Sequence, residues 1–316
     1  MQDLFYKKSR GKSRMRITLL LLLLIGNLSF GSADILIYSF DRPMQLYALL
    51  ESIYTHVTGL NKVMVLCRCR DDKFSKAYDL VKTKFKNTIF IKQGNFPRKD
   101  FRPLMLDAAF SNSTSDYICF CVDDIIVKSK VDLEYCANKI EKHNAYGFYL
   151  RFGKNTTHEW SGQVEDGIPP SVEVEKDLFK WKFKDGEGTV SWCFPNNNDF
   201  TLYRKKDIEP QIRAIPHYNF VNTFYEAYWA GFADKEKYGL YFSQSKIINV
   251  NVNIVNLEQP SFQQFTTEWQ NRIEQYNPVK LLEKFNQGIR IDIDKYNFSN
   301  NSPHQEVPLF FKKAQK

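Results

Sequence analysis

From Asp34 onward, short apolar runs alternate with amphipathic segments of helical spacing. The runs that we expect to form strands are residues 34–40, 61–67, 88–92, 117–122 and 145–152. The segments that we expect to form helices are residues 43–56, 73–85, 100–113 and 130–144. Regular alternation of this kind is typical of βαβ units, so the sequence predicts an α/β fold with a mainly parallel sheet flanked by helices.

The regular alternation ends after Gly153. Residues 154–200 are rich in Gly, Pro, Asn and Trp, and they predict a long irregular excursion with a hairpin turn at residues 185–188. Helical spacing returns in residues 210–215, 219–233 and 261–288, strands are predicted within residues 240–255, and the tail is predicted to be loose except at residues 304–311. The chain therefore divides into residues 1–33, 34–152, 153–296 and 297–316.

The first of these parts carries most of the charge. Of the net charge of +8, residues 1–33 supply +5, from six basic residues and one acid, which leaves +3 for the rest. The basic cluster precedes an apolar run, Ile17 to Ile25, and small residues, so it predicts a secretory signal peptide or a signal anchor. We expect a protein of the secretory pathway or one anchored to a membrane, at its cytoplasmic face if the source is bacterial. The small remaining charge argues against nucleic-acid binding.

Two adjacent acids, Asp123 and Asp124, follow the most apolar of the predicted strands, Tyr117 to Val122. Ligands of open α/β sheets bind outside the carboxyl ends of the strands, where paired carboxylates suit a divalent cation held against a phosphate. The alternative is a solvated turn in which an Asp caps the next helix. The residues alone leave both interpretations open.

The cysteines form two pairs with one residue between them, Cys67/Cys69 and Cys119/Cys121. Alternate residues of a strand point to one face, so each pair could supply two zinc ligands. Both pairs lie in or at the ends of apolar strands with no His nearby, which favours small buried apolar side chains. We predict no disulfide framework.

The opening stretch "YSFDRPMQLYALLESI", three further βα units and the apolar strand that ends in two acids resemble the nucleotide-sugar-binding half of GT-A glycosyltransferases, over roughly residues 34–150. The nearest pattern is that of the inverting family that builds polysaccharides. Later stretches, "FYLRFGKN", "NDFTLYRKKDI", "NTFYEAYW" and "NQGIRIDI" with a late "HQE", resemble a branch of nucleotide-diphospho-sugar transferases in which "VDD" replaces the usual Asp-x-Asp.

This resemblance implies a GT-A-like fold and a hexosyltransferase-like activity. Residues 34–152 would bind the nucleotide-sugar donor, and residues 153–296 would bind the acceptor and carry out catalysis. The enzyme would transfer a sugar to a hydroxyl of a glycan, lipid or protein acceptor, with inversion and with a divalent cation, Mn or Mg. The alternative is a non-catalytic exported carbohydrate-binding or surface protein on the same fold. A metal hydrolase is disfavoured because no nucleophile accompanies the acids.

The resemblance also implies roles for individual residues. Adjacent side chains diverge in extended backbone, so Asp124 is expected to bind the cation and Asp123 to turn toward the ribose or cap a turn. His304 is implied as a further metal ligand, with simple exposure as its alternative. The donor-binding candidates are Ser39, Asp41, Arg42, Arg68, Arg102 and Asp123. Arg102 precedes a proline at an expected helix start, where helix amides favour phosphate; its alternative is solvated surface.

The acceptor hydroxyl needs a general base. Glu226 lies on a predicted helix among aromatic residues, where burial would raise its pKa and where Tyr225 and Trp229 could stack on sugar rings. Asp199, at a predicted loop–strand junction, is the rival candidate. We favour Glu226 as the base.

Overall fold

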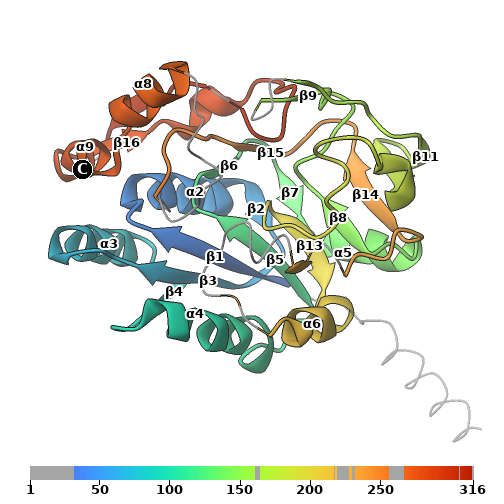
Figure 1. Ribbon diagram of the computed structural model, residues 1–316, viewed down its shortest axis with the longest axis horizontal. Coiled ribbons are helices and arrows are strands. Elements are labelled where there is room, and N and C mark those ends of the chain that lie inside the picture. Colours follow the sequence, from blue (N-terminus) through green and yellow to red (C-terminus); the bar gives the residue numbers. More distant parts are fainter. Residues whose placement is uncertain are drawn as a thin grey trace, which may run out of the picture.

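The computed structural model describes residues 32–160, 164–216, 218, 228–229, 232–255, 267–305 and 307–314. At its centre is a nine-stranded sheet with the strand order β11-β12-β14-β8-β13-β5-β1-β3-β4 (Figure 1). The strands are β1 (Ala33–Phe40), β3 (Leu60–Arg68), β4 (Thr88–Lys92), β5 (Tyr117–Val122), β8 (Gly147–Tyr149), β11 (Ser171–Glu175), β12 (Leu178–Lys182), β13 (Thr201–Arg204) and β14 (Tyr238–Phe242). All but β12 and β13 run in one direction, so the predicted α/β fold with a mainly parallel sheet is confirmed.

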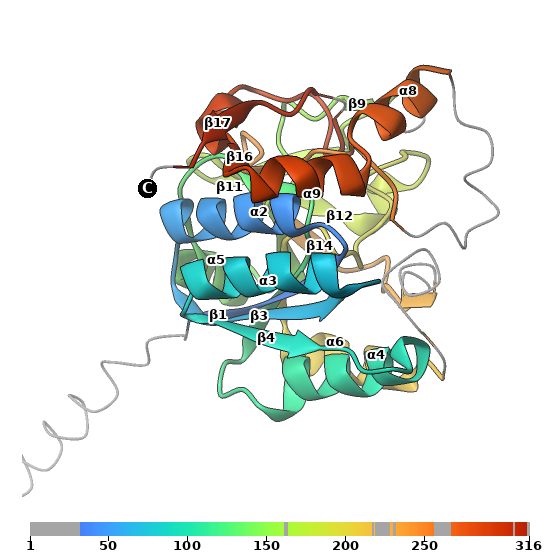
Figure 2. The ribbon, with the colours of Figure 1, turned by 90° about the vertical axis from the view of Figure 1, so that its left-hand side faces the viewer.

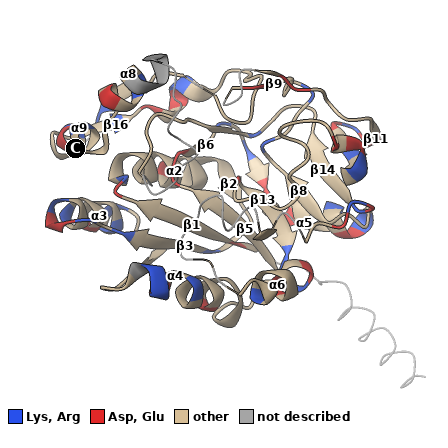
Figure 3. Ribbon diagram, in the orientation of Figure 1, with Lys and Arg blue, Asp and Glu red and all other residues tan. Residues whose placement is uncertain are grey.

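Helices cover both faces of this sheet. One face carries α2 (Pro43–His56), α3 (Asp72–Lys84) and α5 (Leu133–Lys142), with α9 (Pro278–Asn286) packed on α2 and α3. The other face carries α4 (Pro97–Leu106) and α6 (Lys205–Ala214) (Figure 2). Alternate side chains of β1 enter the two cores: Ile35 and Ile37 pack toward α2, and Leu36 packs toward α4, because successive strand residues point to opposite faces. Charged residues of both signs lie along the outer helices (Figure 3).

The less regular half of the chain extends the same sheet. Strands β11 to β14 lie within it and continue the sheet beyond β5, so the sheet crosses the boundary expected at residue 152. The hairpin of β11 and β12 turns at residues 176–177, where Asp177 has a left-handed φ of 66°. The chain also turns at residues 185–188, where Thr189 N donates to the Gly186 carbonyl, but the hairpin predicted there is wrong. The hairpin can turn at Asp177 because Asp tolerates left-handed backbone. Residues 183–186 instead form a 3-10 helix, in which Gly186 packs against Trp192.

Several short elements complete the fold. They are β2 (Val57–Thr58), β6 (Ile125–Val127), β7 (Val131–Asp132), β9 (His158–Glu159), β10 (Val164–Glu165), β15 (Ile247–Asn249), β16 (Ile289–Ile291), β17 (Phe311–Lys313), helix α8 (Thr267–Gln275), a π-helical turn (Asp107–Ser111) and a 3-10 helix (Ile293–Tyr296). The tail is attached to the body, because β17 pairs with β16 and His304 forms a bridge with Asn249. Asn300 and Ser302 are fully buried as well, so the prediction that residues 297–303 are loose is wrong.

The N-terminal segment expected to be a signal or anchor lies almost entirely outside the described residues, as does most of the helix expected at residues 219–233. Among the residues that the structure describes, no helix is both long enough and apolar enough to cross a membrane.

Candidate functional site

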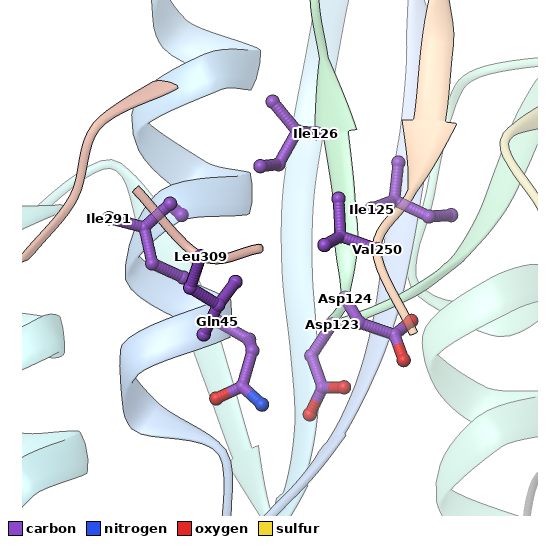
Figure 4. Close-up of a pocket in the computed structure, with 9 residues that line it drawn as sticks. Gln45, Asp123, Asp124, Ile125, Ile126, Val250, Ile291 and Leu309 are labelled. Carbon is purple, nitrogen blue, oxygen red and sulfur yellow. The ribbon is translucent and has the colours of Figure 1, made fainter. Parts of the chain in front are cut away.

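The two adjacent acids lie where β5 ends, in the middle of the sheet. Strand β5 pairs with β1, with Val122 opposite Tyr38, so the acids lie beside the carboxyl end of β1. Both are buried: Asp123 is 3% exposed and Asp124 is 8% exposed. They line a small pocket between α2, β6 and the C-terminal segment, with both carboxylates toward one end and Ile126 toward the other (Figure 4).

Arg42 links the two acids. It follows β1 at the start of α2, and its Nη1 lies 2.9 Å from Asp123 Oδ1 and 3.0 Å from Asp124 Oδ2. The same guanidinium donates from Nε to Asn253 Oδ1 at 2.8 Å and from Nη2 to the Asn253 carbonyl. Burial alone would lower the pKa of Arg42, but the two carboxylates outweigh it and raise that pKa. Three of the candidate residues, Arg42, Asp123 and Asp124, therefore lie together at the carboxyl ends of β1 and β5.

The oxygens of the two carboxylates are not equally satisfied. Asp123 Oδ2 accepts from Ser39 Oγ at 2.7 Å, and Ser39 Oγ lies 2.5 Å from the Tyr78 hydroxyl. Burial raises the pKa of Asp123 to about 6, against the opposing effect of Arg42. Asp124 Oδ1 is buried and has no hydrogen-bond partner among the described residues. An orphaned buried carboxylate oxygen is costly unless a cation or water completes it, so Asp124 carries the open position of the site.

Two of the donor-binding candidates have other partners. Asp41 has a left-handed φ of 52°, and its buried carboxylate accepts from the backbone N of Arg70 at 2.9 Å and from Arg70 Nε at 2.5 Å. Burial raises the pKa of Asp41 despite this partner. The guanidinium of Arg68 lies over the ring of Phe40, 4.7 Å from its centroid. Asp41 therefore orders the loop after β3, and Arg68 covers the end of β1.

Arg102 does not lie at a helix start. Helix α4 begins at Pro97, because proline is favoured at the first position of a helix. Arg102 and Pro103 therefore lie inside the helix. The guanidinium donates to the carbonyls of Arg213 and Ile215, at 3.0 and 3.3 Å, and so caps the end of α6. The expected placement beside helix-terminal amides is wrong, and the contacts of Arg102 are structural.

A second group of charges surrounds His304. Its Nδ1 lies 3.5 Å from Glu159 Oε2 and its Nε2 lies 3.8 Å from Asp199 Oδ2. Asp199 also accepts from Arg151, whose Nη2 donates to the Ser191 carbonyl at 3.0 Å. Glu159, Asp199 and Arg151 are buried. We call these four residues, Arg151, Glu159, Asp199 and His304, the histidine cluster.

The charges of the histidine cluster decide what its members can do. Burial alone would lower the pKa of His304, but the carboxylates of Asp199 and Glu159 raise it to about 10. Burial alone would raise the pKa of Asp199, but Arg151 and His304 lower it. His304 and Asp199 therefore have each other, Glu159 and Arg151 as charged partners. The implied metal role of His304 and the rival base role of Asp199 stay predictions.

Of the proposed base and its two aromatic neighbours, only Trp229 is among the described residues. Glu226 and Tyr225 are outside the described residues. Trp229 is fully buried, with its ring 5.7 Å from that of Phe120 and 5.4 Å from that of Tyr203. The expected stacking of Trp229 on a sugar ring is wrong, because the indole belongs to the core between the sheet and α6.

Four site residues were missed by sequence reasoning: Tyr78, Arg151, Glu159 and Asn253. Only Arg151 has a sequence signal, because it stands inside the apolar run "FYLRF", where a buried guanidinium requires a carboxylate partner. The others come from segments remote in sequence, and nothing in their local pattern marks them.

The cysteines do not form a second site. All six thiols are free, and Cys67, Cys119 and Cys121 are buried in the sheet. Burial raises the pKa of Cys67 to about 11. In the described part of the chain, no three His, Cys, Asp or Glu side chains already form a metal-binding group.

Comparison with known proteins adds an independent line of evidence. No protein-family model matches the chain. Over 199 residues the chain is 28% identical to the bifunctional glycosyltransferase pgtA of Dictyostelium discoideum. The match covers 58% of this chain and 25% of that protein. The resemblance to glycosyltransferases is confirmed. The matched region spans about a quarter of the length of this glycosyltransferase relative.

Solved structures match only weakly. TarS of S. aureus is 12% identical with a TM-score of 0.41, over 66% of this chain and 36% of that one. The 4-diphosphocytidyl-2C-methyl-D-erythritol synthase of Anaerococcus prevotii is 11% identical with a TM-score of 0.41, over 79% of this chain and 99% of that one.

Proposed function

We propose that this chain is a metal-dependent, inverting glycosyltransferase that moves a sugar from a nucleotide-diphosphate sugar to an acceptor hydroxyl. The observation that carries the proposal is the buried pair Asp123 and Asp124 at the carboxyl end of β5, where one carboxylate oxygen has no partner in the described part of the chain. The glycosyltransferase relative supports the same reaction class. The acceptor would be a glycan, lipid or protein, and residues 1–33 would direct the body to the secretory pathway or anchor it to a membrane.

The residues present fit a divalent cation. Mg and Mn prefer oxygen ligands, and Asp124 Oδ1 is a carboxylate oxygen without a partner among the described residues. The two acids and Arg42 together carry a formal charge of −1 once both acids are ionised, so added positive charge is favoured. A cation held by Asp124 would offset the charge of the leaving diphosphate.

The chain's own residues would carry out the remaining steps. The carboxylate of Glu226 takes the proton of the acceptor hydroxyl, whose oxygen forms a bond to the anomeric carbon while the bond from that carbon to the diphosphate oxygen breaks. Attack opposite the leaving group inverts the anomeric centre. Arg42 and the residues at the end of β5 hold the leaving diphosphate. The donor-binding residues and the base Glu226 therefore come from different parts of the chain.

Two substitutions test this assignment in a screen of UDP- and GDP-sugars with and without Mn. Asp124→Asn should weaken donor binding and turnover together, and excess Mn should restore part of the loss. Glu226→Gln should leave donor affinity nearly unchanged and lower the transfer rate by ~10²–10⁴-fold, the size of general base catalysis. Glu274→Gln, at an exposed residue, is the matched control.

Two results would count against the proposal. Near-parent transfer by Glu226→Gln would move the base elsewhere, and parent-like donor and metal binding by Asp124→Asn would remove the acid pair from the site. A parent protein that binds carbohydrate but neither transfers nor hydrolyses any donor would favour the non-catalytic carbohydrate-binding alternative.

A further inference from the structure

Arg42 occupies the space between the two carboxylates of the donor site. A single nitrogen, Nη1, lies within hydrogen-bond distance of one oxygen from each acid, at 2.9 and 3.0 Å. A magnesium ion bound to those same two oxygens would lie about 2.0–2.1 Å from each. Both cannot fit there at once, so a cation bridging Asp123 and Asp124 requires the guanidinium to leave.

The rest of the guanidinium is held by a segment distant in sequence. Nε and Nη2 both donate to Asn253, and Asn253 Nδ2 in turn donates to the carbonyl of Tyr276 at 2.7 Å. The side chain of Arg42 is 11% exposed, so it lies near the surface. Two nitrogens of Arg42 are therefore held by Asn253, and the third, Nη1, faces the acids. Rotation of the guanidinium would move Nη1 from the two carboxylates to a different partner.

The unpartnered Asp124 Oδ1 gives a cation its first contact. It is the one carboxylate oxygen of the pair that neither Arg42 nor Ser39 occupies in the described structure. A cation bound only there would have one protein ligand and would lie beside a positive guanidinium, which opposes binding. The donor's diphosphate offers Arg42 a new partner and relieves this repulsion, because guanidinium binds phosphate as well as it binds carboxylate.

We propose that Arg42 is the resident counter-ion of the acid pair, and that a divalent cation displaces its guanidinium from Asp123 and Asp124 onto the diphosphate of the donor. This inference rests on the proposed function. It makes metal and diphosphate binding mutually dependent through one side chain, and by linkage each ligand strengthens the other by the same factor.

The test compares Mn²⁺ affinity in the parent and in Arg42→Met, with and without UDP, by the electron paramagnetic resonance signal of free Mn²⁺. Without UDP, Arg42→Met should bind Mn²⁺ about tenfold tighter or more, because a unit charge in contact with the ion is removed. The tightening caused by UDP should be smaller in Arg42→Met than in the parent. Lys280→Met removes the same charge from an exposed ion pair and should behave like the parent.

A second variant guards against misfolding. Arg42→Lys keeps the charge but loses the planar fork, and its Mn²⁺ affinity without UDP should lie between those of the parent and Arg42→Met. The melting temperature of Arg42→Met is then measured in chelator, in Mn²⁺ and in NaCl. A low melting temperature that Mn²⁺ restores and NaCl does not supports the displacement, because Mn²⁺ then replaces the missing counter-ion.

The outcomes separate this inference from the function on which it rests. Equal or weaker Mn²⁺ binding in both Arg42 variants, in a parent that binds Mn²⁺ and UDP, overturns only the displacement. A parent that binds neither Mn²⁺ nor UDP overturns the proposed function and the displacement together.

Discussion

The donor site and the histidine cluster each bury two carboxylates, but they are completed differently. At the proposed donor site, Arg42 is shared by Asp123 and Asp124, and one oxygen of Asp124 has no partner among the residues that the structure describes. In the histidine cluster, Asp199 pairs with Arg151 and both acids face His304, so the formal charges cancel when His304 is protonated. The first group has a deficit of positive charge that a ligand can fill, whereas the second is already neutral.

This difference indicates why similar acids have different roles. Buried charges are tolerated when they are paired, and an incompletely paired group is retained at a cost to stability. Under the proposed function, binding of a cation and a diphosphate at Asp123 and Asp124 would offset that cost. The histidine cluster instead joins β9, the start of β13 and the C-terminal segment, so its charges hold the fold together.

The largest effect is expected from breaking the histidine cluster at its most buried cation. Arg151→Met leaves Asp199 buried without its main partner, and removing one member of a buried ion pair costs about 3–5 kcal/mol. Urea unfolding of Arg151→Met should show this loss. The exposed pair of Lys280 and Glu274 is the control, and Lys280→Met should change the free energy of unfolding by less than about 1 kcal/mol. Equal effects of the two substitutions would contradict a structural role for the cluster.

A smaller, pH-dependent effect is expected at His304. Its pKa is raised from 6.5 to about 10, so the protonated form stabilises the folded state. That contribution is fully present below pH 6.5 and is lost as the pH rises through about 10. His304→Gln should therefore cost about 2–3 kcal/mol at pH 6.5, the size of hydrogen bonds between charged groups, and little at pH 10. A difference between parent and variant that is constant from pH 6.5 to 10 would show that His304 is neutral.

The smallest effects come from a matched pair of serines, each donating one hydroxyl to a buried carboxylate. Ser39 Oγ lies 2.7 Å from Asp123, and Ser191 Oγ lies 2.8 Å from Glu159. Substitution of either by Ala should cost about 1–1.5 kcal/mol in urea unfolding. Only Ser39→Ala should also change Mn²⁺ affinity. If Ser191→Ala changes that affinity as much, the two groups are not independent and the comparison fails.

Much of the fold could be predicted from the sequence because local periodicity determines it. The strands and helices of residues 34–149 follow an alternation of short apolar runs and amphipathic segments: β1 is an apolar run buried on both faces, and α2 has helical spacing. The later strands are short and lie among loops. Strand β8 covers only Gly147–Tyr149 of the run predicted for residues 145–152, because the backbone turns at Leu150 and Arg151. Three-residue strands carry too few residues for a periodic signal.

The candidate site likewise contains residues that local pattern predicts and residues that it does not. Asp123, Asp124 and Arg42 could be predicted because each stands at the carboxyl end of a strand recognised by its pattern, and such ends meet at one edge. The partners of His304 could not, because Asp199 and Glu159 approach it only through the tertiary fold. Pairing across such separations depends on the packing of loops, and a single sequence contains no record of it.

The histidine cluster also constrains how this protein is made. A chain emerges from the ribosome with its N-terminus first, and Glu159, Arg151 and Asp199 are synthesised well before His304. Until His304 emerges, two carboxylates share one cation and cannot be buried at low cost. The strands of the donor half can pair during synthesis, but this region must stay hydrated until the C-terminal segment arrives. Closing such long-range contacts is slow, so docking of the segment that carries His304 is expected to follow the pairing of the donor-half strands.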